Sequence, residues 1–271
     1  MEVVDDKYSV LMSVYYKEKP EYLQQSMESI LNQTVPTDDF VLVCDGPLTP
    51  ELDSVISQYS TLHVVRLKEN GGLGNALNEG MKHCQHELIA RMDSDDISRP
   101  DRCERELKVF ADYPVVDVVS GTIEEFITSP DEVYSRRVLP ENNDEIVEFA
   151  KKRNPFNHPA VMYRKSAVEA AGGYKDFYLL EDYFLWIRMI QQGCQGYNIP
   201  EPVLWMRAGS DLYGRRGGWK YVESEKKLFS YMLNKGFITS SQYRSAMFSR
   251  AAGALIPNWV RTILYKRMLR G

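Results

Sequence analysis

Four short apolar runs alternate with helical patterns over the first 110 residues, and this alternation restricts the fold more than any other feature of the sequence. The apolar runs cover residues 8–15, 40–46, 62–67 and 87–92, and the helical patterns cover 20–34, 50–59 and 71–84. Pro20 and Pro50 stand in the first turns of two of these helices, where proline is favoured. Strands joined by helices through short connections predict an α/β fold, with a mostly parallel central sheet flanked by helices.

The pattern is less regular after residue 115. We expect strands at 115–127, 160–164 and 203–207, a helix at 181–193, and an excursion rich in Pro, Asp and Asn at 128–144. From residue 217 onward the sequence is mainly helical. We therefore divide the chain into an α/β domain, residues 1–215, and a helical C-terminal extension, residues 216–271.

The composition is that of a soluble globular protein, with 44% hydrophobic and 26% charged residues in a chain of 271. No run approaches the roughly 20 apolar residues of a membrane span, and the N-terminus lacks the basic region of a signal peptide. The four cysteines match no metal or disulfide spacing, so we interpret them as reduced thiols. These features predict a cytoplasmic protein.

The charges are unevenly distributed, because no Asp or Glu follows Glu225. Nine cations do follow it: Lys226, Lys227, Lys235, Arg244, Arg250, Arg261, Lys266, Arg267 and Arg270. Residues 253–270 mix four of them with apolar side chains that include Trp259 and Tyr265. Such a basic extension is typical of peripheral contact with the inner face of the plasma membrane, and the alternative is a helix pair packed on the domain. The acidic body has no basic stripe, which argues against nucleic-acid binding.

Three carboxylates, Asp93, Asp95 and Asp96, follow the fourth apolar run directly. The D-x-D spacing places the side chains of Asp93 and Asp95 on the same side of an extended backbone. Mg²⁺ and Mn²⁺ accept one or two carboxylates together with substrate phosphates, and their charge offsets the repulsion within such a cluster. The alternatives are a solvated acidic loop or the N-cap of the helix beginning near Pro100. Ligands bind beyond the carboxyl ends of strands in open α/β sheets, which is where this cluster lies, and from the residues alone these interpretations stay open.

Six segments together resemble the family 2 glycosyltransferases of bacterial surface-polysaccharide synthesis, which have the GT-A fold. The segments are SVYYKEKPEYLQQSMESILNQT (13–34), VLVCDG (41–46), ENGGLGNALNEG (69–80), ARMDSDDISRPDR (90–102), NHPAVMYRK (157–165) and LLEDYFLWIRM (179–189). They occur in the family's order and span roughly residues 8–210. The resemblance implies that residues 1–215 form a nucleotide-sugar transferase domain.

The resemblance also implies a donor-binding side. Ser13 and Tyr15 correspond to positions that hold the nucleobase, and Asp45 to the Asp that binds uracil or ribose. Asn70 and Gly72 correspond to a segment lining the base and the sugar phosphate. A plain strand-to-helix turn is the alternative for these glycines, and the G-x-G-x-x-G fingerprint of dinucleotide folds fails here. Many family members have Arg where this chain has Leu77, so any contact made by that Arg is absent or supplied elsewhere.

The metal site implied by the resemblance is the D-x-D pair. Asp93 and Asp95 would hold Mn²⁺ or Mg²⁺, with Asp95 as the direct ligand and Asp93 also touching the donor. Asp96 either orients the sugar or caps the following helix.

Glu181 and Asp182 open the predicted helix at 181–193, where acidic residues are also favoured by the helix dipole alone. In the resembling family this pair is the "ED" motif, and Asp182 corresponds to the catalytic base. A sugar hydroxyl is a poor nucleophile, so a carboxylate must take its proton as the new bond forms. One base without a covalent nucleophile implies inversion at the anomeric carbon.

The remaining candidates are single residues with a structural alternative. His158 lies where the family often has a His beside the active site, although a lone His is commonly a core residue. Trp186 faces the core or the acceptor. Arg207, Arg215 and Arg216 lie in or beside a glycine-rich segment, and arginine suits phosphate oxygens. They would form a lid over the donor diphosphate, grip an acceptor phosphate, or be an exposed basic loop.

The sequence therefore predicts an inverting, metal-dependent enzyme that transfers a hexose or N-acetylhexosamine from a UDP-sugar to a saccharide hydroxyl, the acceptor being lipid-diphosphate-linked. Two alternatives stay open, a nucleotidyltransferase and an inactive sugar-nucleotide-binding protein. The first is disfavoured because residues 13–22 lack a glycine-rich triphosphate loop. The sugar, the acceptor, the linkage and the oligomeric state are left undetermined.

Overall fold

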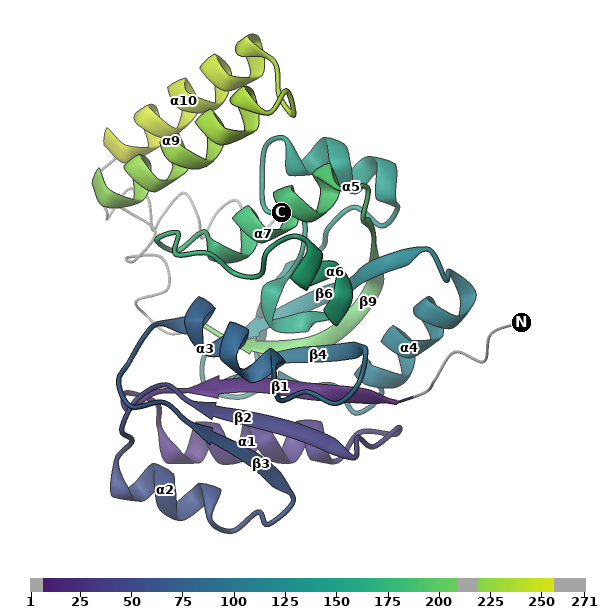
Figure 1. The fold of residues 1–271 in the computed structure, drawn as a ribbon, viewed down its shortest axis with the longest axis vertical. Helices are drawn as coiled ribbons and strands as arrows, with labels where there is room; N and C mark the ends of the chain where they lie inside the picture. The colour runs from purple at the N-terminus through teal and green to yellow at the C-terminus, as the bar shows by residue number, and fades with distance from the viewer. Residues whose placement is uncertain (1–6, 209–218, 256–271) are drawn as a thin grey trace.

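One central sheet of nine strands organises the α/β domain in the computed structural model, which describes residues 7–208 and 219–255 (Figure 1). The strands are β1 (Tyr8–Val14), β2 (Asp39–Cys44), β3 (Leu62–Arg66), β4 (Leu88–Asp93), β5 (Ile97–Ser98), β6 (Val116–Phe126), β7 (Val133–Arg137), β8 (Val161–Arg164) and β9 (Gln195–Arg207). Their spatial order is β3-β2-β1-β4-β8-β6-β9-β5, and β7 pairs with β6.

The first four strands are parallel, as the alternation of strands and helices predicts. Both faces of β1 are buried, which explains its continuous run of apolar residues. The pairs β4–β8, β8–β6, β6–β7 and β5–β9 are antiparallel, whereas β6 and β9 are parallel. The fold class is therefore confirmed, with antiparallel additions in its second half.

Helices cover both faces of the sheet (Figure 1). They are α1 (Pro20–Leu31), α2 (Pro50–Ile56), α3 (Leu73–Met81), α4 (Arg102–Asp112), α5 (Asn143–Ala150), α6 (Lys165–Ala170) and α7 (Glu181–Gln191). One apolar core packs α1, α2 and α4 against the even-numbered residues of β1, β2 and β4, such as Met12. The other packs α3, α6 and α7 against the odd-numbered residues, such as Leu11.

Several predicted bounds change in the second half of the domain. The strand predicted at 203–207 is the end of β9, which has 13 residues and begins at Gln195. The excursion at 128–144 contains β7 and the start of α5. The strand at 115–127 is the single strand β6. The second half lacks the regular alternation of apolar runs and helical patterns seen in the first half, because the bounds of its strands depend on pairing with strands far along the chain.

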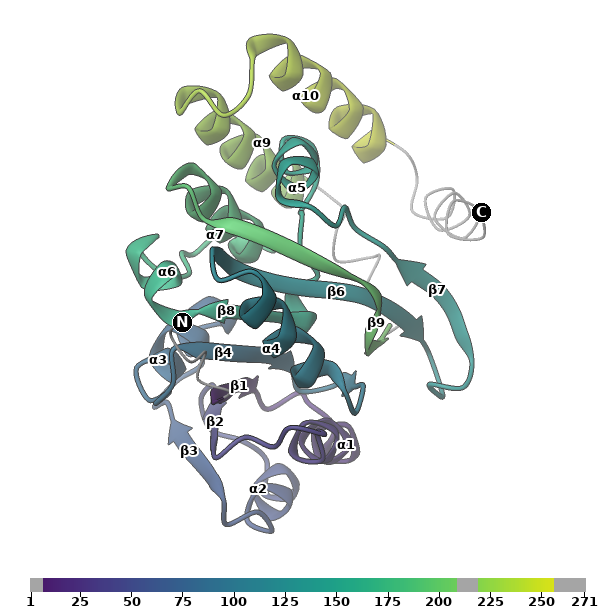
Figure 2. The same ribbon diagram turned by 90° about the vertical axis from the view of Figure 1, so that its right-hand side faces the viewer.

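Two further helices, α9 (Trp219–Asn234) and α10 (Ser240–Leu255), lie side by side above α7 (Figure 2). Leu228, Phe229 and Met232 pack against Tyr183 and Ile187 of α7 in a third apolar cluster. The described part of the C-terminal extension therefore packs on the domain, and residues 256–271 lie outside the described residues. Among the residues that the structure describes, no helix is both long and apolar enough to cross a bilayer.

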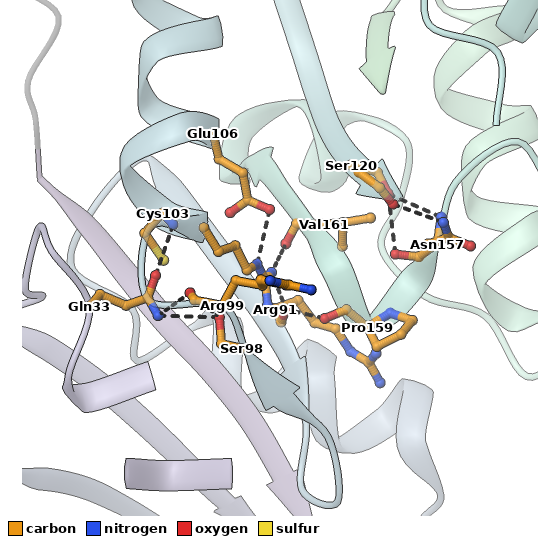
Figure 3. Close-up of polar contacts among 12 residues, drawn as sticks. Gln33, Arg91, Ser98, Arg99, Cys103, Glu106, Ser120, Asn157, Pro159 and Val161 are labelled. Atoms are coloured by element: carbon orange, nitrogen blue, oxygen red, sulfur yellow. Dashed lines mark hydrogen bonds and ion pairs between the residues drawn. The ribbon is translucent and has the colours of Figure 1, made fainter. Parts of the chain in front are cut away.

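A buried polar network holds β4 against its neighbours on the α4 face of the sheet (Figure 3). The Arg102 guanidinium donates hydrogen bonds to the carbonyl oxygens of Arg91, Pro159 and Val161, and it pairs with Glu106. Pro159 belongs to a short 3₁₀ turn, η1 (His158–Ala160). Arg102 therefore fixes this turn against β4, and with it the residue His158.

Candidate active site

The acidic cluster lies at the carboxyl end of β4, as the sequence predicts. Asp93 is the last residue of β4 and pairs in register with Ser13 of β1. Tyr15 follows β1 directly and its side chain is 38% exposed. Ser13, Tyr15 and the start of the acidic cluster therefore share one edge of the sheet, the edge at which open α/β sheets bind ligands.

Asp95 and Asp96 occupy different environments within the cluster. Burial, together with the charges of Asp93 and Glu18, raises the pKa of Asp95 to about 7. Asp96 is 2% exposed and accepts the backbone N–H of Arg207 over 2.8 Å, and burial raises its pKa as well. Asp96 therefore bonds to the strand end of β9, and within the described part of the chain it makes no hydrogen bond to the N-terminus of α4.

Glu18 is a member of this acidic group that the sequence analysis missed. It precedes α1, and its Oε2 accepts a hydrogen bond from Ser94 Oγ over 2.7 Å. Its charge is among the causes that raise the pKa of Asp95. No local pattern marks Glu18, because only the packing of α1 beside β4 brings it to the cluster.

Arg207 fixes the acidic loop. Its Nε donates to the carbonyl oxygen of Asp95 over 2.9 Å, its Nη2 donates to Gln25 over 2.8 Å, and its guanidinium lies 3.8 Å from the ring centre of Tyr22. These contacts differ from the lid or exposed loop expected of it. Arg215 and Arg216 lie outside the described residues, so the predicted grip on phosphate by that pair stays a prediction.

Asp45, Asn70 and Gly72 come together in one turn beyond β2. The carboxylate of Asp45 accepts the backbone N–H groups of Gly71 over 2.8 Å and Gly72 over 3.0 Å, and Asn70 Nδ2 donates to the Asp45 carbonyl over 3.1 Å. Gly46 has a φ of +86°, and a Cβ there would lie 2.7 Å from the Asn70 nitrogen. Asp45 therefore holds the glycine-rich turn in place, and a nucleobase contact stays a prediction.

Leu77, where the resembling family often has Arg, is completely buried in the core beneath α3. It offers no contact to a ligand. The Trp186 side chain is completely buried too, packed against Phe156 at a ring distance of 5.5 Å. Trp186 was expected to face either the core or the acceptor, and it lies in the core.

The pair Glu181 and Asp182 opens α7, as predicted. Asp182 Oδ2 accepts a hydrogen bond from Asn154 Nδ2 over 2.6 Å, and Oδ1 accepts the backbone N–H of Tyr183 over 2.6 Å. Leu179, just before the pair, has a φ of +58°, an uncommon conformation for a non-glycine residue. Such strain persists where the surrounding structure over-determines the backbone, and it is common at functional sites.

The acidic pair on α7 lies within electrostatic reach of the acidic cluster on β4. Burial and then the charge of Asp182 raise the pKa of Glu181 to about 7, with the charge of Asp93 as a smaller cause that acts in the same direction. The Arg91 charge acts in the opposite direction. Two motifs 88 residues apart in sequence therefore lie near each other, since the Asp93 charge acts on Glu181.

His158, in the turn η1, lies close enough to Arg91 to be affected by its charge. Its Nε2 is 2.9 Å from the hydroxyl of Tyr174, and its ring packs against Trp186 at 6.0 Å. Burial, and then the nearby Arg91 charge, lowers the pKa of His158 well below its usual value. A His that stays neutral at physiological pH suits a packed, hydrogen-bonding role more than proton transfer, so its predicted catalytic role gains no support from its contacts.

The acidic cluster fits a divalent cation held together with a substrate. Among the described residues, no three His, Cys, Asp or Glu side chains form a preformed metal cage. Mg²⁺ sites of the kind that bind nucleotides need no such cage, because one or two carboxylates combine with phosphate oxygens and water. The raised pKa of Asp95, caused partly by Asp93 and Glu18, shows excess negative charge that a cation would offset. Asp93 and Asp95 would hold the ion.

Arg91, Asn154 and Tyr174 also escaped the sequence analysis. A charged residue inside the apolar run 87–92 was a usable signal for Arg91, since a buried strand rarely holds an arginine without a role. Asn154 and Tyr174 lie in irregular segments, and only the tertiary contacts bring them to the site.

Comparison with known protein families gives one match over most of the α/β domain. The family described as Glycosyl transferase family 2 matches residues 9–172.

Relatives extend the similarity over the whole chain. A Haemophilus influenzae protein described as an uncharacterized glycosyltransferase is 39% identical over 269 residues, covering 97% of this chain and 99% of the relative. The amylovoran biosynthesis glycosyltransferase AmsE of Erwinia amylovora is 39% identical over 270 residues, covering 97% and 100%. The Escherichia coli UDP-Gal:alpha-D-GlcNAc-diphosphoundecaprenol beta-1,3-galactosyltransferase is 37% identical over 267 residues, covering 97% of each.

Solved structures share the fold at low identity. Staphylococcus aureus TarS 1-349 in complex with UDP-GlcNAc superposes with a TM-score of 0.67 and 17% identity, covering 89% of this chain and 70% of TarS. The mannosyltransferase PcManGT of Pyrobaculum calidifontis, in complex with GDP-Man and Mn²⁺, has a TM-score of 0.64 and 16% identity, covering 97% and 80%. At such identities the likeness shows the common fold alone.

Proposed function

The chain belongs to glycosyl transferase family 2 and has its GT-A fold, and from this premise we propose that it is an inverting, metal-dependent transferase of surface-polysaccharide synthesis. The donor is a UDP-sugar and the transferred group is a hexose or N-acetylhexosamine. The acceptor is a hydroxyl of a saccharide linked through diphosphate to a lipid.

The observation that carries this proposal is the meeting of two acidic groups from distant parts of the chain. Asp93 and Asp95 come from the end of β4, and Glu181 and Asp182 from the start of α7, close enough for Asp93 to raise the pKa of Glu181. A glycosyl transfer needs both groups, because one side of the reaction carries a diphosphate and the other a hydroxyl that must lose its proton.

Asp182 acts as the base in this proposal. Asn154 holds Oδ2 and the Tyr183 backbone holds Oδ1, so the carboxylate keeps one orientation and each oxygen retains a free lone pair for the acceptor hydroxyl. Taking up that proton increases the nucleophilicity of the hydroxyl oxygen as it attacks the anomeric carbon. A divalent cation bound at Asp95 would supply positive charge at the departing diphosphate. Attack from the face opposite the diphosphate inverts the configuration.

The choice of donor and acceptor has support from the E. coli relative, whose name gives UDP-Gal as donor and a GlcNAc-diphosphoundecaprenol as acceptor. Its similarity covers 97% of this chain. We propose the same classes of donor and acceptor here, and leave the sugar itself open.

An enzyme that uses a lipid-linked acceptor must reach that acceptor at the inner face of the plasma membrane. We propose that residues 1–215 are the transferase domain and that the basic extension, residues 216–271, contacts the anionic membrane surface. Trp219 and Phe248 are 80% and 79% exposed, and Lys226 and Lys227 are exposed on α9. Exposed aromatic and basic side chains together favour the interface of an anionic bilayer.

The test is a screen of UDP-sugars with Mn²⁺ and an acceptor that carries a saccharide, a diphosphate and a lipid tail. We expect one UDP-sugar to give a product, EDTA to abolish its formation, and the new linkage to have the anomeric configuration opposite to that of the donor. Retention of configuration would contradict the single-base mechanism. Full activity in EDTA would contradict the metal requirement.

Substitution of the base separates an enzyme from an inactive sugar-nucleotide-binding protein. In Asp182→Asn the shape is kept and the proton acceptor is lost, so we expect kcat to fall about 100-fold or more while UDP binds as in the wild type. Equal turnover in the wild type and the variant would exclude Asp182 as the base.

A further inference from the structure

Two buried arginines meet at β4, Arg91 of the strand itself and Arg102 of α4, and they differ in how many of their donor groups are hydrogen-bonded. Arg102 has a completely buried guanidinium group that donates to three backbone carbonyls and pairs with Glu106. These bonds satisfy its charge and connect β4 to β8 and η1. Its structural role is therefore accounted for by its contacts.

Arg91 is equally buried but far less bonded. Its side chain is 1% exposed, and Nη2 pairs with Oδ1 of Asp93. Nε and Nη1 have no hydrogen-bond partner among the described residues. Unpaired buried donors and buried charges are both unfavourable, so contacts within the fold do not account for this arginine.

The charged groups around Arg91 are those of the candidate active site. Its charge acts on Asp96 at the strand end and on Glu181 at the start of α7, and it favours the ionised form of both. It also acts on His158 and Tyr174. Arg91 therefore lies near both acidic groups and is bonded to Asp93.

We propose that Arg91 is a positioning residue for the donor: its bond to Oδ1 holds the Asp93 carboxylate in one orientation at the end of β4, where the donor diphosphate binds. This inference rests on the proposed function, because it takes a nucleoside diphosphate as the ligand of the site. Arg91 acts in this way although none of its own donor groups is exposed.

Calorimetric titration with UDP and Mn²⁺ tests the role without using turnover. We expect Arg91→Met to weaken UDP binding about tenfold or more, because a charge-assisted bond that orients Asp93 is lost. Arg91→Lys keeps the charge but loses the planar fork, and should weaken binding about threefold. In transfer assays the donor KM should rise in both variants while the acceptor KM stays unchanged.

A double-mutant cycle with Asp93→Asn shows whether Arg91 acts through Asp93. We expect Arg91→Met/Asp93→Asn to bind UDP within about twofold of Asp93→Asn alone, because the two residues form one unit. Arg102→Met is the matched control: it removes an equally buried arginine, and should lower the melting temperature without coupling to Asp93→Asn in UDP affinity.

Three results would overturn the inference. The first is wild-type UDP affinity in a folded Arg91→Met protein. The second is that the effects of Arg91→Met and Asp93→Asn on UDP affinity multiply in the double variant. The third is wild-type UDP affinity in Arg91→Lys, and this result decides the matter if Arg91→Met does not fold. Absence of UDP binding by the wild-type protein with Mn²⁺ would instead contradict the proposed function.

Discussion

Asn154 Nδ2 donates a hydrogen bond to Asp182 Oδ2 over 2.6 Å, joining the loop after α5 to the first turn of α7. Arg137 Nη2 in turn donates to the Asn154 carbonyl oxygen over 3.0 Å. The orientation of the proposed base is therefore set from β7 and the α5 loop as well as from its own helix.

Replacing Asn154 tests this arrangement. We expect Asn154→Ala to lower kcat about tenfold with little change in the donor KM, since the base loses its fixed orientation. Asn154→Asp replaces the amide donor by a second carboxylate beside Asp182, so we expect it to lower kcat at least as much as Asn154→Ala does. The measurement is kcat and the donor KM in steady-state assays. Asn32→Ala, at the exposed end of α1, is the control, and an equal loss there would argue against a specific role.

Glu181 should make the stability of the fold depend on pH. Its pKa is raised from 4.5 to about 7, mainly by burial, so between these values the folded protein keeps a proton that the unfolded chain has lost. The free energy of unfolding must therefore fall as pH rises from about 4.5 to about 7. In Glu181→Gln we expect this decline to shrink by about 1–3 kcal/mol. Urea unfolding in EDTA at several pH values measures it, and an unchanged slope would contradict the raised pKa.

Asp95 should make metal binding depend on pH. Because the pKa of Asp95 is about 7, a cation must displace a proton at lower pH. We expect the Mn²⁺ affinity, measured by titration with UDP present, to rise about tenfold from pH 6 to pH 8 and then level off. Asp95→Asn should abolish Mn²⁺ binding. Asp38→Asn, an exposed Asp paired with Lys7, is the control and should bind Mn²⁺ as the wild type does.

Gly46 should be required for the turn that carries Asp45. Its φ is +86° and an added Cβ would lie 2.7 Å from the Asn70 nitrogen, so Gly46→Ala combines backbone strain with a clash. We expect a loss of about 3 kcal/mol or more in the free energy of unfolding. Gly193→Ala separates the two effects, because Gly193 has a φ of +89° and no atom within 4 Å of an added Cβ. It should cost about 1 kcal/mol. Equal losses would show that the close approach does not matter.

The first half of the fold could be read from local patterns. Each of β1 to β4 is a short apolar run that ends in turn residues, the helices between them have helical apolar patterns, and α1 and α2 begin with proline. Parallel strands joined by helices leave few arrangements open. The second half could not be predicted as well from local patterns, because β8 inserts antiparallel between β4 and β6, and β9 pairs with β6 across about 80 residues.

The sequence by itself determined the parallel sheet, the carboxylates at the end of β4 and the acidic start of α7, because each depends on residues adjacent in the chain. Only the tertiary structure decided that Asp93 and Glu181 share a site, that Asn154 holds Asp182, and that Arg91 lies buried beside Asp93. Contacts of that kind join segments tens of residues apart, and no local periodicity records which distant segment will pack against which.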